Sequence, residues 1–385
     1  MNRVPMVPLE ELMATRQGSV DPSKFASETF ALYSIPAFDS RRPEVLTGGA
    51  IGSTKQVVQP EDVLLSKIVP HIRRSWIVGP KGEHRQIASG EWIVFRNPRV
   101  VPEYLRHALL SDDFHAQFMQ TVSGVGGSLL RARPAQVAKI QIPLPPLTEQ
   151  RRIAAILDKA DALRTKRREA LAQLDRLAQA IFVDMFGDLF VNSKNYPISR
   201  LGDACDVRDG THDSPLYVSD GYPLVTSKNL RNGKIDTADV NYISEVDYNE
   251  INRRSKVDFG DILLPMIGTI GNPVLVDEQP SFAIKNMALI KFKTKSPTRE
   301  FVFQFLRGDC FDRLVASKNK GGTQKFLALG EIRGLPTPVP PEASQNEFSQ
   351  RVQAIAHARK RYEEALDATN ALFASLQHRA FSGEL

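Results

Sequence analysis

Two long segments with apolar residues at coiled-coil spacing place the strongest restriction on how this chain of 385 residues can fold. In residues 148–186 the apolar side chains recur at alternating steps of three and four, with one interruption at Arg167. This spacing predicts a heptad seam on a single long helix. Charged residues flank the seam on both sides, so the helix cannot bury its narrow apolar stripe alone. A second long helix must therefore pack against it.

The second helix is predicted at residues 344–381, where the same spacing recurs. Paired antiparallel, about 38 helical residues with a rise of ~1.5 Å each would form a rod of roughly 55 Å. The most economical interpretation of the seam is a plain core between the two helices, with partner surfaces on flanks such as Arg152, Lys159 and Tyr362. The predicted seam residues are Ile153, Ile156, Leu163, Leu174, Leu177 and Ile181 in the first helix and Phe348, Val352, Ile355 and Leu366 in the second.

The two helices belong to an internal repeat that covers the whole chain. Pro145-Pro146 precedes the first helix and Pro340-Pro341 the second, an offset of 340 − 145 = 195 that Gln150 and Gln345 share. Residues 62–65, 92–95 and 104–114 find counterparts at 261–264, 289–292 and 301–311. Short apolar runs between glycine and proline residues predict strands, and residues 102–119 have helical spacing. The heptads and the offset together predict two similar mixed α/β globules that alternate with two long helices.

The predicted fold class is therefore α/β (α+β), with two globules joined by two antiparallel coiled-coil helices about a pseudo-two-fold axis. The predicted domains are residues 1–147 and 196–341 for the globules, and residues 148–195 and 342–385 for the helical repeats.

Several classes of protein are disfavoured by what the sequence lacks. It contains no Walker A motif, no glycine-rich strand-to-helix fingerprint for an adenosyl cofactor and no His/Cys/Asp set with metal-ligand spacing. We therefore expect no catalytic residues, no metal and no cofactor. No apolar run approaches the length needed to span a membrane. Cys205 and Cys310 suggest no disulfide framework, which fits a reducing compartment such as the cytoplasm of a bacterium or archaeon.

Basic residues gather in similar places in the two repeats. Residues 67–106 hold eight Lys or Arg against three Glu, and residues 285–325 hold ten against three Asp or Glu. Such stretches favour two surfaces that face an anion such as DNA, although each charge taken singly could be solvated surface. The predicted DNA-binding residues are Lys67, Arg73, Arg74, Arg85, Arg131 and Arg133 in the first globule and Lys228, Asn229, Arg253, Arg254, Lys285, Asn286, Lys318, Lys320, Gln324 and Lys325 in the second.

The helix entry PLPPLTEQRRIAAIL at residues 143–157 and the ending FSGEL at residues 381–385 resemble the specificity subunits of type I restriction–modification systems. The resemblance covers essentially the whole chain. It implies that each globule recognises one half of a bipartite target on double-stranded DNA and that the helices fix the spacer between the halves. It also implies that the helices dock two methyltransferase (modification) subunits, that restriction (motor–nuclease) subunits join them, and that this subunit itself is not catalytic.

Two other interpretations stay open at this point. A stand-alone nuclease or methyltransferase could carry a site without a recognisable motif, and binding of adenosylmethionine by the isolated chain would identify one. A coiled-coil adaptor with two protein-binding globules would show no affinity for random duplex DNA.

Overall fold

A computed structural model describes residues 4–15, 18–124, 130–231, 233–266, 270–294, 296–318 and 327–385. The chain divides into two compact units, one of Met1–Arg168 with Glu364–Leu385 and one of Glu169–Glu363. Each unit contains one globule together with a portion of both long helices. The first globule is the part of the first unit before the first long helix, and the second globule is the part of the second unit between the long helices.

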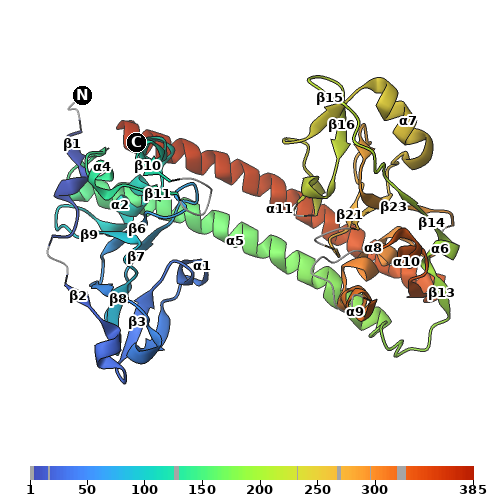
Figure 1. The fold of residues 1–385 in the computed structure, drawn as a ribbon, viewed down its shortest axis with the longest axis horizontal. Helices are drawn as coiled ribbons and strands as arrows, with labels where there is room; N and C mark the ends of the chain where they lie inside the picture. Colours follow the sequence, from blue (N-terminus) through green and yellow to red (C-terminus); the bar gives the residue numbers. More distant parts are fainter. Residues whose placement is uncertain are drawn as a thin grey trace. The chain divides into compact units, whose positions relative to one another are not determined.

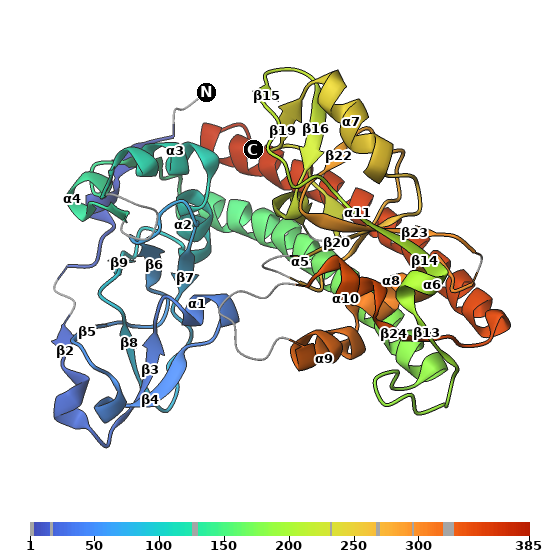
Figure 2. The same cartoon turned by 45° about the vertical axis from the view of Figure 1, so that its right-hand side comes forward.

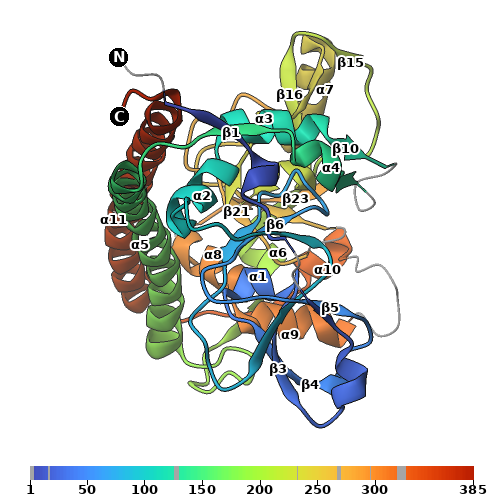
Figure 3. The same ribbon diagram turned by 90° about the vertical axis from the view of Figure 1, so that its left-hand side faces the viewer.

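The two long helices are α5 (Leu147–Phe186) and α11 (Glu342–Ser382), which lie side by side in Figure 3. In the first unit, Ile153 and Leu157 share a core with Phe373 and Ala380. In the second unit, Phe182 lies 5.4 Å from Phe348 between ring centroids. Early residues of α5 thus meet late residues of α11, and late residues of α5 meet early ones of α11. The predicted antiparallel pairing is confirmed.

Two of the six seam residues predicted on α5, Leu163 and Leu177, are 42% and 46% exposed. The residue after Leu163, Arg164, contacts the partner helix instead, and the residue after Leu177, Ala178, is buried. Arg164 places its guanidinium carbon 3.5 Å above the centre of the Phe373 ring. Contacts of this kind, between a long amphipathic side chain and an apolar one, hold the middle of the helix pair. The spacing of apolar residues therefore does not identify the side of α5 that faces α11.

The remaining seam residues fit the prediction better. Ile153 and Phe348 are buried, while the others are partly shielded at the helix pair, namely Ile156, Leu174, Ile181, Val352, Ile355 and Leu366.

The first globule combines two sheets (Figures 1 and 2). The smaller has the order β7-β6-β9 and is antiparallel throughout. Its strands are β7 (Ser75–Ile77), β6 (Val63–Ser66) and β9 (Trp92–Phe95). The larger has the order β2-β5-β8-β3-β4, formed by β2 (Ser19–Val20), β5 (Lys55–Val57), β8 (Arg85–Ala88), β3 (Thr29–Tyr33) and β4 (Glu44–Thr47). The shorter elements of this globule include β10 (Val122–Ser123), which pairs with β11 (Arg131–Ala132), and the helices α1 (Ala37–Ser40) and α4 (Pro134–Val137).

The helix predicted at residues 102–119 is two helices, α2 (Pro102–Leu109) and α3 (Asp112–Gln120). Ser111 separates them because its hydroxyl accepts from the amide of Phe114 and so caps a new helix. The second globule repeats this arrangement in α8 (Arg299–Arg307) and α9 (Asp309–Lys318).

The second globule is also built around two larger sheets. One has the order β14-β23-β20-β21, from β14 (Cys205–Asp209), β23 (Met287–Phe292), β20 (Ile262–Pro265) and β21 (Val274–Leu275). The other has the order β15-β19-β16-β22, from β15 (Tyr217–Val218), β19 (Asn241–Ile243), β16 (Tyr222–Val225) and β22 (Ala283–Ile284). The helix α7 (Glu245–Ser255) packs beside the second sheet. The shorter α6 (Leu201–Ala204) and α10 (Leu329–Arg333) flank the first.

The shared scaffold of the two repeats extends to individual hydrogen bonds. The strand pair β1 (Met6–Pro8) with β12 (Gln141–Pro143) recurs as β13 (Ile198–Arg200) with β24 (Pro336–Pro338). The buried Gln150 accepts from Val101 N at 2.8 Å and donates to Pro145 O at 2.8 Å. Gln345 does the same with Thr298 N and Pro340 O, both at 2.8 Å. Each glutamine therefore ties the proline turn at a long helix to the start of a globule helix.

The repeats differ at one buried titratable position, which leads to a prediction about pH. His107 in α2 is 2% exposed and its Nε2 lies 2.8 Å from Asp158 Oδ1, whereas Gln304 in α8 occupies the matching place. Burial, and secondarily the charge of Arg106, holds the pKa of His107 below its usual range.

Below a pH of about 6.5 the unfolded chain takes up a proton at His107 that the folded chain does not, so the first unit should lose stability as pH falls from 7 to 5. We expect His107→Gln to flatten that loss, as measured by thermal unfolding midpoints across this window. An unchanged slope in the variant would contradict the assignment.

Candidate nucleic-acid interface

The turn that follows β6 holds Lys67, Arg73 and Arg74, half of the basic residues predicted in the first globule. Its backbone is held on both sides, because Lys67 N donates to Glu91 O at 3.0 Å and Ala132 N donates to Lys67 O at 2.8 Å. Val69 in this turn has φ = 47°, a conformation that is rare for a β-branched residue. Strain of this kind persists where the surrounding structure enforces it, which is common at binding sites.

Arg74 is distinguished from its neighbours by its lack of partners. Its Nε and Nη1 atoms are shielded from solvent, and neither has a hydrogen-bond partner among the described residues. Arg73, by contrast, contacts Asp112 Oδ1 at 2.5 Å, and Arg131 contacts Glu91 Oε1 at 3.0 Å. Buried guanidinium donors without a partner are costly, so Arg74 is the predicted cation best placed to bind an external acceptor.

The structure brings Lys67, Arg74 and Arg131 together around the end of β6. Ser66 N donates to Arg74 O, and Ile68 forms a bridge with Arg131. Arg133 follows nearby and is exposed. Arg85 lies elsewhere, on β8 of the larger sheet, with its guanidinium carbon 5.8 Å from the centre of the Phe25 ring.

In the second globule a loop after β14 forms the centre of a polar surface. Thr211 N donates to Ile284 O at 3.0 Å and Asn286 N donates back to Thr211 O at 3.1 Å. Asn286 has φ = 55°, which aims its side chain at the loop. Lys285 Nζ donates to Ser214 Oγ at 2.6 Å. Lys285 and Asn286, both predicted, are thus part of one rigid platform.

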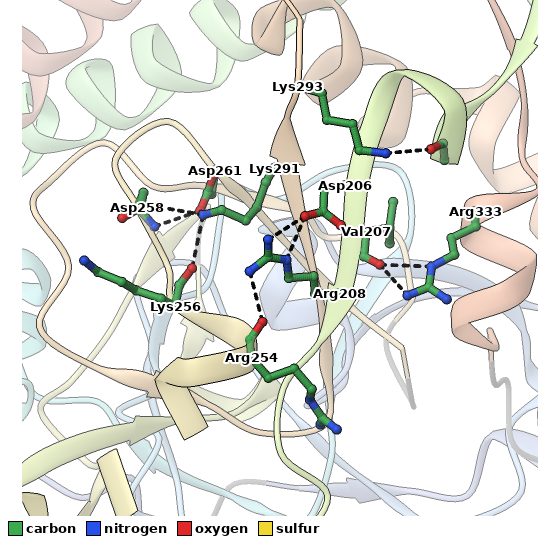
Figure 4. A network of polar contacts seen from close by, with 11 residues as sticks. Asp206, Val207, Arg208, Arg254, Lys256, Asp258, Asp261, Lys291, Lys293 and Arg333 are labelled. Carbon is green, nitrogen blue, oxygen red and sulfur yellow. Dashed lines mark hydrogen bonds and ion pairs between the residues drawn. The ribbon is translucent and has the colours of Figure 1, made fainter. Parts of the chain in front are cut away.

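Arg254 reaches the same platform from the end of α7. Arg208 Nη1 donates to the backbone oxygen of Arg254 at 3.1 Å and so caps the last turn of the helix, as Figure 4 shows. The side chain of Arg254 then points away from Arg208, and its Nη2 donates to Gly210 O at 3.2 Å. Arg253 faces solvent and pairs with Glu250 at 2.7 Å.

Sequence reasoning missed His212, which joins this platform at both ring nitrogens. Its Nδ1 lies 2.9 Å from Asn286 Oδ1 and its Nε2 lies 2.9 Å from Asp209 Oδ2. The hydrogen bonds to Asn286 and Asp209 raise the pKa of His212 above its usual value. A single histidine in a loop has no spacing that would single it out, since its partners lie in other elements. A pocket of about 300 Å³ opens between this loop and α7.

The remaining predicted residues of the second globule either lie apart from this platform or are not among the described residues. Asn229 is 6% exposed and its amide is used internally, donating to Asp236 O and Asp239 O. These bonds hold a turn. Lys228 is exposed beside it in a short 3₁₀ helix (Ser227–Asn229). The side chains of four predicted residues lie outside the description, namely Lys318, Lys320, Gln324 and Lys325. The glycine loops near residues 126 and 321 also fall among the residues that are not described.

Among the described residues, no group of three or more His, Cys, Asp or Glu could hold a metal ion. None of the helices in that part of the chain is long and apolar enough to cross a membrane.

Comparison with known proteins defines the class. The family model for the type I restriction modification DNA specificity domain matches residues 102–174 and 193–366. These ranges cover more than half of the chain and include parts of both globules and both long helices. The chain belongs to this family.

Individual relatives are distant. The specificity subunit of the type I restriction enzyme EcoKI from Escherichia coli (strain K12) is 26% identical over 287 residues, which is 68% of this chain and 61% of that subunit. The chain spans less than two thirds of the length of the curated relatives it matches.

Two solved structures share the fold. The type I restriction–modification S subunit from M. genitalium is 12% identical with a TM-score of 0.57, covering 99% of this chain and 97% of that one. A chain from a structure of the assembly and conformational transition of the type I R-M system is 21% identical with a TM-score of 0.55, covering all of both chains. These likenesses bear on the fold alone.

Proposed function

We propose that this protein is the DNA-reading subunit of a type I restriction–modification complex. Each globule, residues 1–147 and 196–341, recognises one half of a bipartite target on double-stranded DNA. The helical repeats, residues 148–195 and 342–385, set the spacer between the halves. The observation that carries the proposal is a repeated scaffold whose exposed loops differ, as in a protein that reads two different half-sites by the same means.

The site chemistry supports reading of DNA by a combination of fixed and adaptable contacts. The two guanidinium donors of Arg74 that have no partner within the described ranges suit a phosphate or the edge of a guanine base. The platform around Arg254, Lys285 and Asn286 is held by backbone hydrogen bonds, so its side chains need little ordering when they bind.

We assign the chemistry to other subunits. In this proposal two copies of the modification subunit bring the adenine methyltransferase activity, restriction subunits bring the motor and nuclease, and this chain provides no catalytic residue. The complex acts in the cytoplasm of a bacterial or archaeal cell.

A globule exchange tests the modular part of the proposal. Replacing residues 1–147 with the corresponding globule of a related subunit should change one half of the methylated sequence and leave the other half and the spacer intact. Mapping methylated adenines in a host that expresses the hybrid complex measures this. A change in both halves would show that the globules do not read independently.

A further inference from the structure

The two repeats can be compared with each other, and one surface feature is retained in both. In the first unit a groove of about 580 Å³ lies between the turn before β6, the end of β9, the start of α2 and the start of α5. In the second unit a groove of about 630 Å³ lies between the turn before β20, the end of β23, the start of α8 and the start of α11. We call these the first and the second groove.

The two grooves share a similar set of polar contacts. Asp62 Oδ2 accepts from Gln59 N at 2.8 Å, and Asp261 Oδ2 accepts from Asp258 N at 2.7 Å. Both carboxylates are nearly fully buried, at 1% and 5% exposure. Each pairs with a cation from the neighbouring strand, Arg96 at 2.6 Å in the first groove and Lys291 at 2.5 Å in the second. Figure 4 shows Lys291 between Asp258 and Asp261.

The charge of the grooves also agrees. Three carboxylates and two cations line each groove, which leaves one net negative charge in both. The first is lined by Glu61, Asp62, Glu103, Arg96 and Arg151 and the second by Asp258, Asp261, Glu300, Lys291 and Arg299. DNA phosphates are repelled by such a groove, whereas a protein segment with a Lys or Arg side chain is attracted.

The backbone conformation of Glu61 indicates that the first groove has a role besides stabilising the fold. Glu61 has φ = 70°, in the left-handed region where Gly260, with φ = 88°, occupies the matching position of the second repeat. A non-glycine residue is strained there, and glycine would remove the strain. A glutamate retained at this cost places a carboxylate in the groove, while in the second groove Asp258 lies on the same turn.

Other parts of the two globules differ between the repeats. One globule has the five-stranded sheet β2-β5-β8-β3-β4 where the other has the four-stranded sheet β15-β19-β16-β22. Features that differ between the repeats suit two different half-sites. Features that are the same suit one partner that is present twice.

From these observations we infer that the two grooves are equivalent docking sites, each of which takes a basic segment from one copy of the same partner protein. This inference rests on the proposed function, in which the partner is the modification subunit. Both grooves are built mainly from globule elements, so they are distinct from any contact that the partner makes with the long helices.

Charge reversal in one groove at a time tests the inference. The variants are Glu61→Lys and Asp258→Lys, alone and together, with Glu83→Lys and Glu278→Lys as controls, since both control glutamates are exposed and line neither groove. Each variant is purified with co-expressed modification subunit, and native mass spectrometry counts the copies. We expect two copies with the wild type and both controls, one with each single reversal and none with the double reversal, with at least tenfold weaker binding at a reversed groove.

A further variant separates docking from folding. Glu61→Gly should raise the unfolding midpoint of the chain because it relieves the strained conformation, and yet weaken docking at the first groove because it removes a carboxylate. A double reversal that still holds two copies, or a wild type that holds one copy, would overturn the inference. DNA binding by the same preparations is measured separately, so a wild-type complex with two partners and no affinity for its target would contradict the proposed function and leave the grooves supported.

Discussion

Replacing Arg74 with alanine should weaken binding of target DNA by the complex by at least tenfold and lower the salt dependence of that binding. The guanidinium has shielded donors with no partner among the described residues, so DNA would satisfy groups that are otherwise unpaired. A phosphate contact contributes roughly one unit to the slope of log affinity against log salt, and a bidentate base contact about 1–3 kcal/mol of discrimination. Fluorescence anisotropy at several salt concentrations measures both quantities.

The neighbouring arginine provides a matched control for this experiment. Arg73→Ala removes the same charge, but Arg73 already contacts Asp112 and donates to Leu110 O at 3.1 Å. We expect a smaller loss of affinity from this variant. Equal losses from the two variants would mean that the surface attracts DNA only through its net charge, and that the unpaired donors of Arg74 have no special role.

Replacing Gln150 with leucine should destabilise the first unit by on the order of 3 kcal/mol. The substitution keeps an apolar body of similar size but leaves Val101 N and the carbonyl oxygens of Arg99 and Pro145 without their side-chain partner. Each buried polar group left unpaired costs about 1–3 kcal/mol. Urea unfolding, together with amide hydrogen exchange in α2, measures the effect.

The internal repeat predicts a parallel result in the second unit. Gln345→Leu should destabilise that unit similarly, because it removes the partner of Thr298 N and Pro340 O. Gln173→Leu on the exposed face of α5 serves as the control and should change stability by less than about 0.5 kcal/mol. If the buried variants were as stable as the control, the clamp would be incidental to the fold.

Much of the architecture could be predicted because the sequence contains an internal repeat of the scaffold. The matched offsets identified the strands now seen as β6, β9, β20 and β23, and also paired Gln150 with Gln345. Heptad spacing predicted both long helices, and their antiparallel pairing was part of the predicted fold class. The split of the predicted helix at Ser111 was missed because apolar spacing continues through it.

The candidate site was predicted less completely, and the reasons are particular to its residues. Lys67, Arg74 and Arg131 do come together, and so do Arg254, Lys285 and Asn286. The burial of Asn229 was not predicted, because residue type does not reveal that its amide donates to carbonyls seven and ten residues later.

The sequence by itself determined the order of globule, helix, globule and helix. The spacing of apolar residues and the internal repeat can be recognised without knowing which segments are in contact. The tertiary structure decided which side of α5 is inside, turning Leu163 and Leu177 outward and Arg164 onto Phe373. It also decided which cations are paired, because Arg73 contacts Asp112 whereas two guanidinium nitrogens of Arg74 have no partner in the part of the chain that the structure describes. Burial and pairing depend on the neighbours that folding brings from distant parts of the chain, and no residue carries that information in its type or spacing.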